Sequence, residues 1–276
     1  MFESHVRRWD LVPDGPAIAT RTAHLLPVRW AGAPAMLKLS HDPEERRGGA
    51  LMVWWNGEGA ARVLARDAHA VLLERATGPG ALADMARQGQ DDAACRILCG
   101  VAAQLHASHA PHAPRAGPLP ELVPLAQWFR DLAPAAARHG GVLQRSAQAM
   151  RLLLADPRET GVLHGDLHHG NVLDFGARGW LAIDPKGLFG ERGFDFANIF
   201  TNPDLADPSR PVATEPGRFT RRLDVVAQAA GLERQRLLLW ILAWAGLSAS
   251  WFLADGDAHA AIGLQTAALA AGALGW

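Results

Sequence analysis

One stretch of the sequence decides the fold: Val162-Leu163-His164-Gly165-Asp166-Leu167-His168-His169-Gly170-Asn171-Val172-Leu173. The apolar residues at its two ends predict short strands, and the glycines and polar residues between them predict a loop. A further apolar run at 180–183 leads directly into Asp184. The sequence therefore predicts Asp166 and Asn171 on one loop, and Asp184 at the end of the next strand.

This ordered set of three polar residues has the chemistry that phosphoryl transfer from a nucleotide requires. A carboxylate orients a hydroxyl and accepts its proton, while an amide oxygen and a second carboxylate hold Mg²⁺ on the phosphates. We therefore predict Asp166 as the catalytic base and Asn171 and Asp184 as magnesium ligands. Taken alone, an aspartate after Gly165 could equally cap a turn, so the prediction depends on the set.

The histidines of the same stretch allow a different interpretation, a zinc-dependent hydrolase. His164, Asp166 and His168 alternate, so a strand would place them on one side, where they could ligate a metal. However, no further cluster of His, Cys or Glu downstream completes such a site, and Asn171 and Asp184 would then have no role. We expect His164 to brace the loop through hydrogen bonds instead.

A second candidate group lies near the N-terminus. Lys38 is the only lysine among the first 185 residues, and it lies in an apolar strand-like run. A charged side chain there is explained if it bridges the nucleotide phosphates and a glutamate on a helix. We expect that glutamate to be Glu45, with Glu44 as its rival. The alternative is a surface lysine on an edge strand.

The first 75 residues have the pattern of a small antiparallel sheet with one helix. Asp42-Pro43-Glu44-Glu45 has the features of a helix start, and Asn56-Gly57 those of a helix end. Strands are expected at 9–12, 23–30, 35–39, 61–65 and 70–75. Helices are expected afterwards, at 93–107, 122–137 and 142–154, and from the loop to the C-terminus.

These expectations give an α+β fold with two lobes. Residues 1–75 form a β-rich nucleotide-binding lobe, 76–80 a hinge, and 81–276 a helical lobe with the catalytic loop and the acceptor site. The connector at 106–120 is rich in proline and contains His106, His109 and His112, which we expect to be solvated rather than bound to metal.

The bulk composition limits the partners of the chain. A formal net charge of −1 gives no overall field that would attract nucleic acid or an anionic membrane. The uncharged run at 237–254 has only the minimum length of a membrane span, so we expect a buried helix. The N-terminus lacks the apolar core of a signal peptide, and Cys95 and Cys99 suit buried positions in a reducing cytoplasm. We expect a cytoplasmic protein whose substrate is a small molecule.

The motifs together resemble the aminoglycoside phosphotransferases, which have a protein-kinase-like fold. Within that family the sequence is most similar to the streptomycin 6-phosphotransferase type, grouped as aminoglycoside/hydroxyurea antibiotic resistance kinases. The resemblance covers nearly the whole chain, and its marks are Trp55–Leu64, Leu72–Arg75, His164–Asn171, Trp180–Pro185, Gly193–Asn198 and Leu247–Trp251.

The resemblance implies a role for each matching residue. Asp166 would be the catalytic base, and Asn171 and Asp184 would bind Mg²⁺. Lys38 would hold the α- and β-phosphates of ATP, and Glu45 would orient it. Backbone groups at the hinge would contact the adenine, namely those of Glu74, Arg75 and Ala76. The implied reaction is phosphorylation of streptomycin by ATP at its 6-hydroxyl, which inactivates the antibiotic and confers resistance.

The sequence departs from protein kinases in two places. The segment between the first two strands, residues 14–22, does not contain a Gly-x-Gly-x-x-Gly loop. The hydroxyls of Thr20 and Thr22, together with backbone N–H groups, must then cover the phosphates. Pro185 and Lys186 follow Asp184 where protein kinases have Phe-Gly, which argues against a mobile activation segment.

A cationic acceptor such as streptomycin requires carboxylates in the helical lobe. Asp255 is the first choice and Asp195 the second, although Asp195 could instead brace the catalytic region; we expect Trp251 in the core. The remaining candidates are Asp204, Asp207 and Asp257. Two other interpretations stay open: a kinase of another amino-alcohol or sugar, and a nucleotide-binding pseudokinase. The sequence does not distinguish ATP from GTP and does not indicate the oligomeric state.

Overall fold

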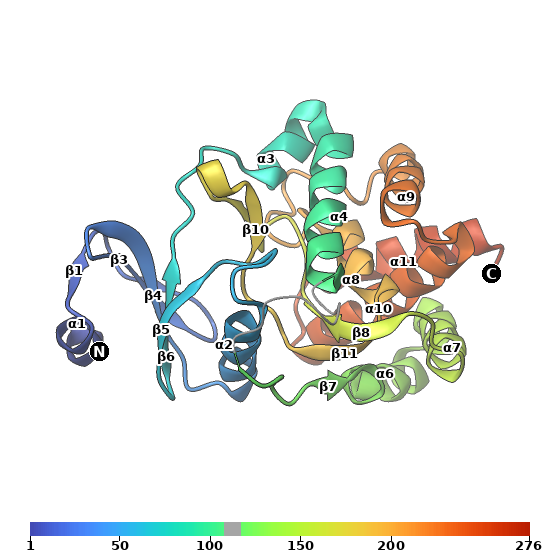
Figure 1. Ribbon diagram of the computed structural model, residues 1–276. Coiled ribbons are helices and arrows are strands. Elements are labelled where there is room, and N and C mark those ends of the chain that lie inside the picture. The colour runs from blue at the N-terminus through green and yellow to red at the C-terminus, as the bar shows by residue number, and fades with distance from the viewer. Residues whose placement is uncertain (108–116) are drawn as a thin grey trace.

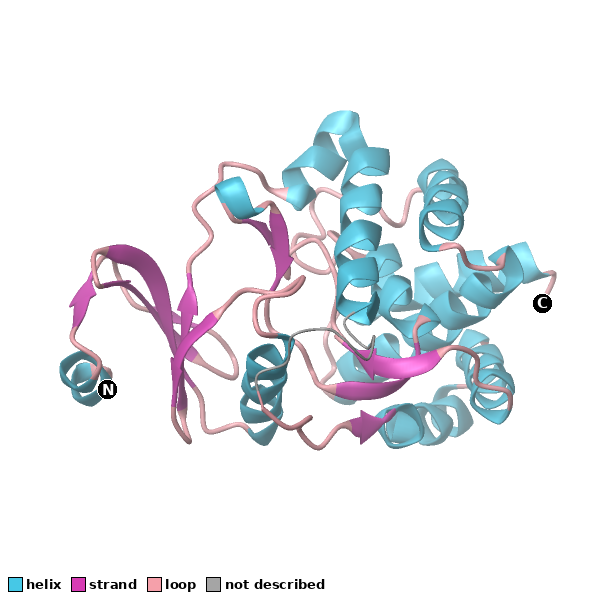
Figure 2. Cartoon of the chain, in the orientation of Figure 1, coloured by secondary structure: helices cyan, strands magenta, loops and turns pink. Residues whose placement is uncertain are grey.

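The computed structural model, which describes residues 1–107 and 117–276, has two parts. An antiparallel sheet forms the N-terminal part and a largely helical region forms the C-terminal part (Figures 1 and 2). This arrangement confirms the predicted α+β, two-lobed, kinase-like fold. His109 and His112 lie outside the described residues.

The N-terminal sheet has six strands, five of them in the order β1-β3-β4-β6-β5, and β2 pairs with the start of β3. Their bounds are β1 Leu11–Pro13, β2 Ile18–Ala19, β3 His24–Trp30, β4 Ala33–Leu39, β5 Val63–Arg66 and β6 Ala70–Glu74. Lys38 lies on β4, which pairs with β3 on one side and β6 on the other. The alternative of an edge-strand lysine is therefore wrong.

Two N-terminal elements have no sequence signature. The helix α1, Glu3–Arg8, buries none of its residues, so no apolar periodicity marks it. The strand β2 is only two residues long and both are exposed. Neither element could be recognised from alternation or helical spacing.

The helix α2, Pro43–Trp55, lies between the sheet and the helical region (Figure 1). It begins as predicted, because the Asp42 side chain accepts a hydrogen bond from the Glu44 N–H at 2.8 Å, and it ends at Asn56 in a left-handed conformation. Its buried Leu51 and Trp55 belong to the same apolar core as residues of the helical region. The helix therefore joins the two parts through one continuous core.

The C-terminal region contains nine α-helices and two small sheets among the described residues. The helices are α3 Leu82–Met85, α4 Asp91–Ala107, α5 Leu125–Trp128, α6 Leu132–His139, α7 Val142–Ala155, α8 Gly193–Ala197, α9 Pro216–Ala230, α10 Arg234–Ala254 and α11 Ala260–Leu274. The sheets are β10-β9 and β7-β11-β8, with β7 Val123–Pro124, β8 Thr160–Leu163, β9 Val172–Asp174, β10 Trp180–Ala182 and β11 Leu188–Glu191.

The prediction of a single helix at 122–137 is wrong, because this range contains a short strand and two helices. The strand β7 pairs in parallel with β11 at its start, and α5 and α6 follow with a short 3-10 turn between them. Pro124 holds an extended backbone (ψ 144°) directly before α5, which stops a helix from beginning earlier. A two-residue strand that depends on a partner more than sixty residues away leaves no local pattern.

The apolar run at 237–254 lies in α10, which is the one helix of the described residues long and apolar enough to cross a membrane. In the most apolar 18-residue part of this helix, 72% is buried inside the protein. Ser248 and Ser250 are buried as well, and the Ser250 hydroxyl donates to the Leu247 carbonyl. These features agree with the expected core helix.

Two glycines let the connection between the parts pass close to the β9–β10 hairpin. The Gly78 N–H donates to the Asp174 carbonyl at 2.9 Å and the Gly80 N–H donates to the Asp174 carboxylate at 3.1 Å. A Cβ at Gly78 would lie 2.0 Å from the Asp174 side chain, and one at Gly80 would lie 2.8 Å from the Trp180 ring. A larger residue at either position would push the hinge away from the hairpin.

We predict that Gly48→Ala destabilises the protein, although alanine normally favours a helix. A Cβ at Gly48 would lie 2.1 Å from the Pro185 backbone oxygen, so α2 would have to move away from the segment that carries Asp184. The matched control is Gly100→Ala, on α4, where an added Cβ meets nothing within 4 Å. Thermal denaturation should show a loss of about 1–3 kcal/mol for Gly48→Ala and a gain of up to ~1 kcal/mol for Gly100→Ala. Equal behaviour of the two variants would contradict the close contact.

Candidate active site

The loop between β8 and β9 is held in place by one buried carboxylate, that of Asp195 on α8. It accepts hydrogen bonds from the N–H groups of His164 (3.0 Å) and Gly165 (2.8 Å), and its Oδ2 lies 2.9 Å from His106 Nε2. Burial alone would raise the pKa of Asp195, but the His106 contact and the backbone donors hold it below its usual value. Because all these groups surround it, Asp195 does not reach the pocket. This corrects its prediction as an acceptor ligand in favour of the bracing role.

His164 is part of the scaffold of the same loop. Its Nε2 lies 2.8 Å from the Ile183 carbonyl, and its Nδ1 accepts the Asp166 N–H at 3.1 Å. Burial lowers its pKa, so the ring is neutral, donating from Nε2 and accepting at Nδ1. Both ring nitrogens are therefore used within the protein. Across the described residues, no three His, Cys, Asp or Glu side chains are grouped as a metal site.

Asp166 itself is oriented by two side-chain amides. Asn171 Nδ2 donates to its Oδ2 at 3.1 Å, and Asn198 Nδ2 donates to its Oδ1 at 2.8 Å. Trp244 fixes the direction of the second amide, because its indole N–H can only donate and reaches Asn198 Oδ1 at 3.1 Å. Asn198 is thus a positioning residue that the sequence analysis missed, although it lies in one of the recognised motifs.

The hairpin of β9 and β10 brings Asn171 and Asp184 together as predicted. Val172 pairs with Ala182, and the Ile183 N–H donates to the Asn171 carbonyl at 2.9 Å. The Asn171 amide nitrogen is engaged with Asp166, while its Oδ1 receives no donor from the described residues. A neutral amide oxygen beside a carboxylate suits Mg²⁺, which needs few protein ligands.

Asp184 has an unusual backbone conformation for this position. Its φ of +57° lies in the left-handed region, which a residue other than glycine adopts at an energetic cost. The conformation turns the chain directly after β10, and the side chain then meets Lys38 from the N-terminal sheet. A strained backbone conformation of this kind is common where a functional side chain must be held in one direction.

Lys38 connects the two parts of the molecule electrostatically. Its Nζ lies 2.5 Å from Glu45 Oε2 and 2.7 Å from Asp184 Oδ1. Burial opposes its charge, but the carboxylates of Asp184 and Glu45 outweigh burial and raise its pKa. The structure thus pairs Lys38 with Glu45 rather than with Glu44, whose Oε1 instead lies 3.0 Å from Lys186 Nζ.

The two threonines predicted to cover phosphates make other contacts. The Thr20 hydroxyl donates to the Ala23 carbonyl and accepts from the Ala23 N–H, both at 3.0 Å. The Thr22 hydroxyl donates to Glu45 Oε1 at 2.7 Å. Both hydroxyls therefore shape the loop and hold α2, which differs from the predicted phosphate contact. Arg21, between them, lines the pocket.

The hinge offers fewer free backbone groups than predicted. The Glu74 N–H donates to the Arg62 carbonyl at 3.0 Å, and the Arg75 N–H makes a long contact of 3.4 Å with the Pro34 carbonyl. Of the three predicted backbone donors, that of Ala76 is therefore the one without a partner in the described part of the chain.

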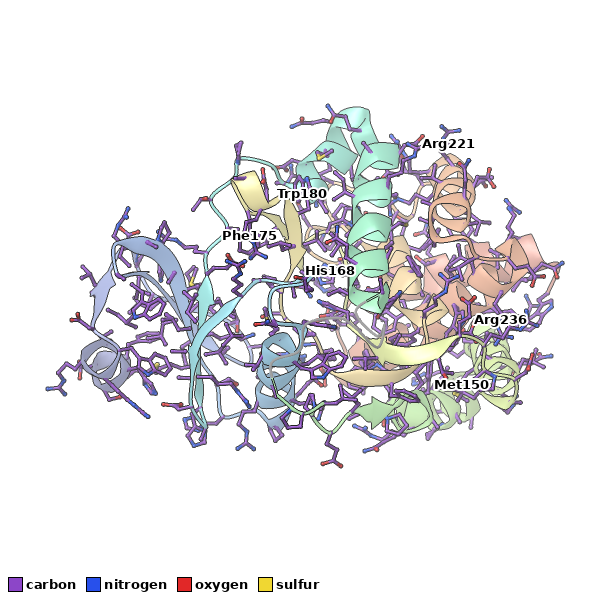
Figure 3. All side chains as sticks on the ribbon, viewed as in Figure 1. Met150, His168, Phe175, Trp180, Arg221 and Arg236 are labelled. Atoms are coloured by element: carbon purple, nitrogen blue, oxygen red, sulfur yellow. The ribbon has the colours of Figure 1, made fainter. Side chains whose placement is uncertain are left out.

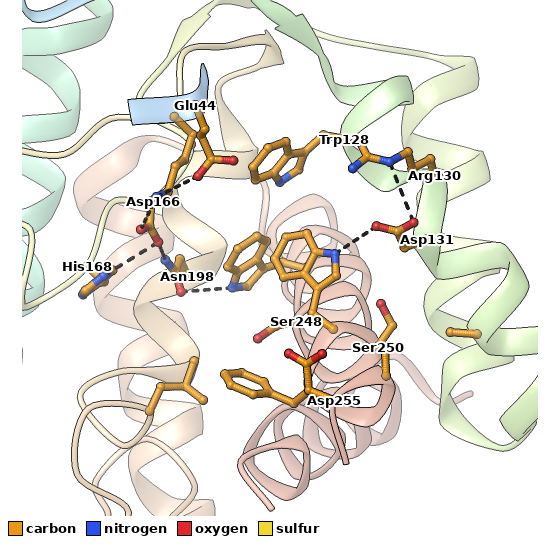
Figure 4. Close-up of a pocket in the computed structure, with 18 of the residues that line it drawn as sticks. Glu44, Trp128, Arg130, Asp131, Asp166, His168, Asn198, Ser248, Ser250 and Asp255 are labelled. Carbon is orange, nitrogen blue, oxygen red and sulfur yellow. Dashed lines mark hydrogen bonds and ion pairs between the residues drawn. The ribbon is translucent and has the colours of Figure 1, made fainter. Parts of the chain in front are cut away.

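A cavity of about 930 Å³ opens beside Asp166 (Figure 4). His168 also lines this cavity, and it lies near the centre of the molecule, between the sheet and the helices (Figure 3). The wall contains four carboxylates and four large aromatic side chains, which are Glu44, Asp131, Asp166 and Asp255, and Trp128, Trp244, Trp251 and Phe252. The wall also contains four basic side chains, which are Arg21, Arg130, Arg138 and Lys186. A positively charged acceptor would therefore depend on the aromatic rings and on a carboxylate away from Lys186, such as Asp255.

Only one of the other predicted acceptor carboxylates lines this cavity, Asp255. Asp204 accepts three backbone N–H bonds from 212–214, Asp207 binds Ser209 and Arg210, and Asp257 binds His259. These three aspartates therefore cap local turns and loops.

Trp251 is partly buried and packs against the core as expected, but it also lines the cavity. Its ring lies edge-on to Trp128 on the cavity wall, and its indole N–H donates to Asp131 Oδ2 at 3.2 Å. Asp131 had no sequence signal, because the contact joins residues 120 positions apart.

The chain matches a protein-family model described as aminoglycoside/hydroxyurea antibiotic resistance kinase over residues 8–256. It is 56% identical over 268 residues to a streptomycin 3''-kinase of Klebsiella pneumoniae, covering 96% of this chain and 98% of that protein. It is 35% identical over 269 residues to a streptomycin 6-kinase of Streptomyces glaucescens, covering 94% and 84% of the two chains.

Among solved structures, the fold is similar to that of a thermostable mutant of aminoglycoside phosphotransferase APH(4)-Ia, solved as a ternary complex with ADP and hygromycin B. The TM-score is 0.61 at 14% identity, and the match covers 97% of each chain. This similarity concerns the fold and extends over both the sheet and the helical region.

Proposed function

The chain belongs to the aminoglycoside/hydroxyurea antibiotic resistance kinase family, and we propose that it transfers the γ-phosphoryl group of ATP to a hydroxyl of streptomycin. The product would no longer act as the antibiotic, so the activity would confer resistance. We place the reaction in the cytoplasm, where ATP is available.

One observation carries the proposal: the Asp166 carboxylate accepts a hydrogen bond from Asn171 and also lines a large cavity. Asp184 follows β10, which pairs with the strand that begins directly after Asn171. In the proposed reaction an acceptor hydroxyl enters from the cavity, and the Asp166 carboxylate accepts its proton as the oxygen attacks the γ-phosphorus. Asn171 and Asp184 would hold the Mg²⁺, whose charge offsets that of the phosphates. Lys38 would exchange its contact with Asp184 for the α- and β-phosphates while Glu45 keeps it oriented.

The cavity wall supports streptomycin as the acceptor. The antibiotic carries guanidinium groups, which pair with carboxylates and stack on aromatic rings. Asp131 and Asp255 offer the carboxylates. The Trp251 indole donates to Asp131, and the Trp128 ring lies edge-on to that of Trp251. A relative whose name specifies streptomycin shares 56% of its residues with this chain, over nearly its whole length.

The position of phosphorylation is proposed as the 3''-hydroxyl. The streptomycin 3''-kinase is 56% identical to this chain, whereas the two 6-kinases are each 35% identical. The resemblance seen in the sequence motifs implies the 6-hydroxyl instead. The higher identity favours the 3''-hydroxyl over that expectation.

The direct test is phosphate transfer from ATP to streptomycin by the purified protein, followed by NMR assignment of the phosphorylated carbon. We expect Mg²⁺-dependent formation of streptomycin 3''-phosphate. Asp166→Asn, which keeps the shape but not the proton acceptor, should lower kcat by about 10²–10⁴-fold. Phosphate at the 6-position would overturn the assignment of the hydroxyl, and no transfer to streptomycin would overturn the proposal.

A second prediction concerns the acceptor carboxylates. Asp255→Asn removes a charge from the cavity wall, so the KM for streptomycin should rise by about 3- to 10-fold with little change in kcat, as expected for a solvent-exposed ion pair. Asp257→Asn is the matched control, since Asp257 lies two residues away and binds His259 outside the cavity. Identical KM values for the two variants would rule out Asp255 as an acceptor ligand.

A further inference from the structure

The chain contains only two lysines, Lys38 and Lys186, against 25 arginines. Both lysines lie at the active site, and each is held by one of two consecutive glutamates on α2. Glu45 holds Lys38 from the sheet, and Glu44 holds Lys186 from the helical region. The sequence predicts Glu44 and Glu45 as rivals for one lysine, whereas in the structure each glutamate holds its own lysine.

The side chain of Lys186 lies at the catalytic carboxylate. Its Nζ is 3.0 Å from Glu44 Oε1 and 3.8 Å from Asp166 Oδ2. Both carboxylates and Lys186 line the acceptor cavity, where Glu44 lies close to Asp166 (Figure 4). The ammonium group is therefore located where the acceptor hydroxyl and the transferred group must meet.

The backbone of Lys186 is fixed from both sides. Its N–H donates to the His164 carbonyl of the catalytic loop at 2.7 Å, and its carbonyl accepts from Arg47 Nε on α2 at 2.8 Å. A Cβ on Gly165 would come within 3.0 Å of the Lys186 Cβ. The backbone is thus fixed beside the catalytic loop, and the contact with Glu44 holds the ammonium group near Asp166. A group that stabilises a transition state requires such positioning in advance.

The choice of lysine over arginine is informative in this chain. Its buried structural ion pairs use arginine, as in Arg222–Asp91 and Arg236–Glu191, because the planar guanidinium binds a carboxylate through two hydrogen bonds. An ion pair whose only task was to hold Glu44 would follow the same preference. A compact ammonium group with three donors instead suits a contact that takes a second partner during the reaction.

We propose that Lys186 is a catalytic residue that binds the γ-phosphoryl group of ATP during transfer, an inference that rests on the proposed kinase activity. The acceptor oxygen forms a bond to the γ-phosphorus, its proton passes to Asp166, and the bond from the γ-phosphorus to the bridging oxygen breaks. ADP leaves with that electron pair. Lys186 keeps Glu44 as one partner and takes an oxygen of the moving phosphoryl group as the other, while Lys38 remains on the α- and β-phosphates.

The decisive experiment compares nucleotide binding to the full-length wild type and Lys186→Met, using ADP and the ATP analogue AMP-PNP, each with Mg²⁺ and without acceptor. Loss of a charged contact to the γ-phosphate should weaken AMP-PNP binding by about 10- to 100-fold and leave ADP binding nearly unchanged. Lys38→Met is the comparison variant, and it should weaken both ligands. Equal effects of Lys186→Met on ADP and AMP-PNP, or no effect on either, would overturn the proposal.

Kinetics supply the second readout. Lys186→Met should lower kcat by about 10²–10³-fold, and Lys186→Arg should retain more activity because it keeps the charge. If Lys186→Met is unstable in thermal denaturation, Lys186→Gln replaces it in both measurements. Equal kcat values for Lys186→Arg and the neutral variants would contradict the role of the charge. Selective loss of AMP-PNP binding together with no transfer to streptomycin would support Lys186 and refute only the acceptor proposal.

Discussion

The ion pair between Lys38 and Asp184 is the interaction on which the site depends, because it joins groups 146 residues apart from the two parts of the molecule. A buried charge is costly unless it is paired and hydrogen-bonded, and Lys38 has two carboxylate partners. One of them, Glu45, is carried by α2, and the same helix holds Lys186 through Glu44. The placement of α2 therefore determines the position of both ammonium groups.

Much of this arrangement could be predicted from local sequence. The loop with Asp166 and Asn171, the strand that leads to Asp184 and the capped start of α2 all leave short-range patterns, since glycines, alternation and capping residues act within a few positions. Lys38 was recognisable because its charge did not fit its apolar neighbours in the sequence. The other features were recognisable because neighbouring residues completed a known loop, strand or cap pattern.

The remaining features depend on contacts between distant segments. Asp195 has the same local appearance whether it binds an acceptor or braces a loop, and only the donors of His164, Gly165 and His106 decide between these roles. Asn198 acquires its function from Trp244, 46 positions away. The strand β7 depends on its pairing with β11, and a two-residue strand is too short to show alternation.

A crystal structure of the protein with AMP-PNP, Mg²⁺ and streptomycin tests the central claim most directly. The account predicts that the 3''-oxygen lies within roughly 3 Å of the Asp166 carboxylate, with Lys38 on the α- and β-phosphates and still paired with Glu45. It also predicts the Lys186 ammonium group on the γ-phosphate. A complex in which no streptomycin hydroxyl approaches Asp166, or in which the phosphates lie away from Lys38, would contradict it.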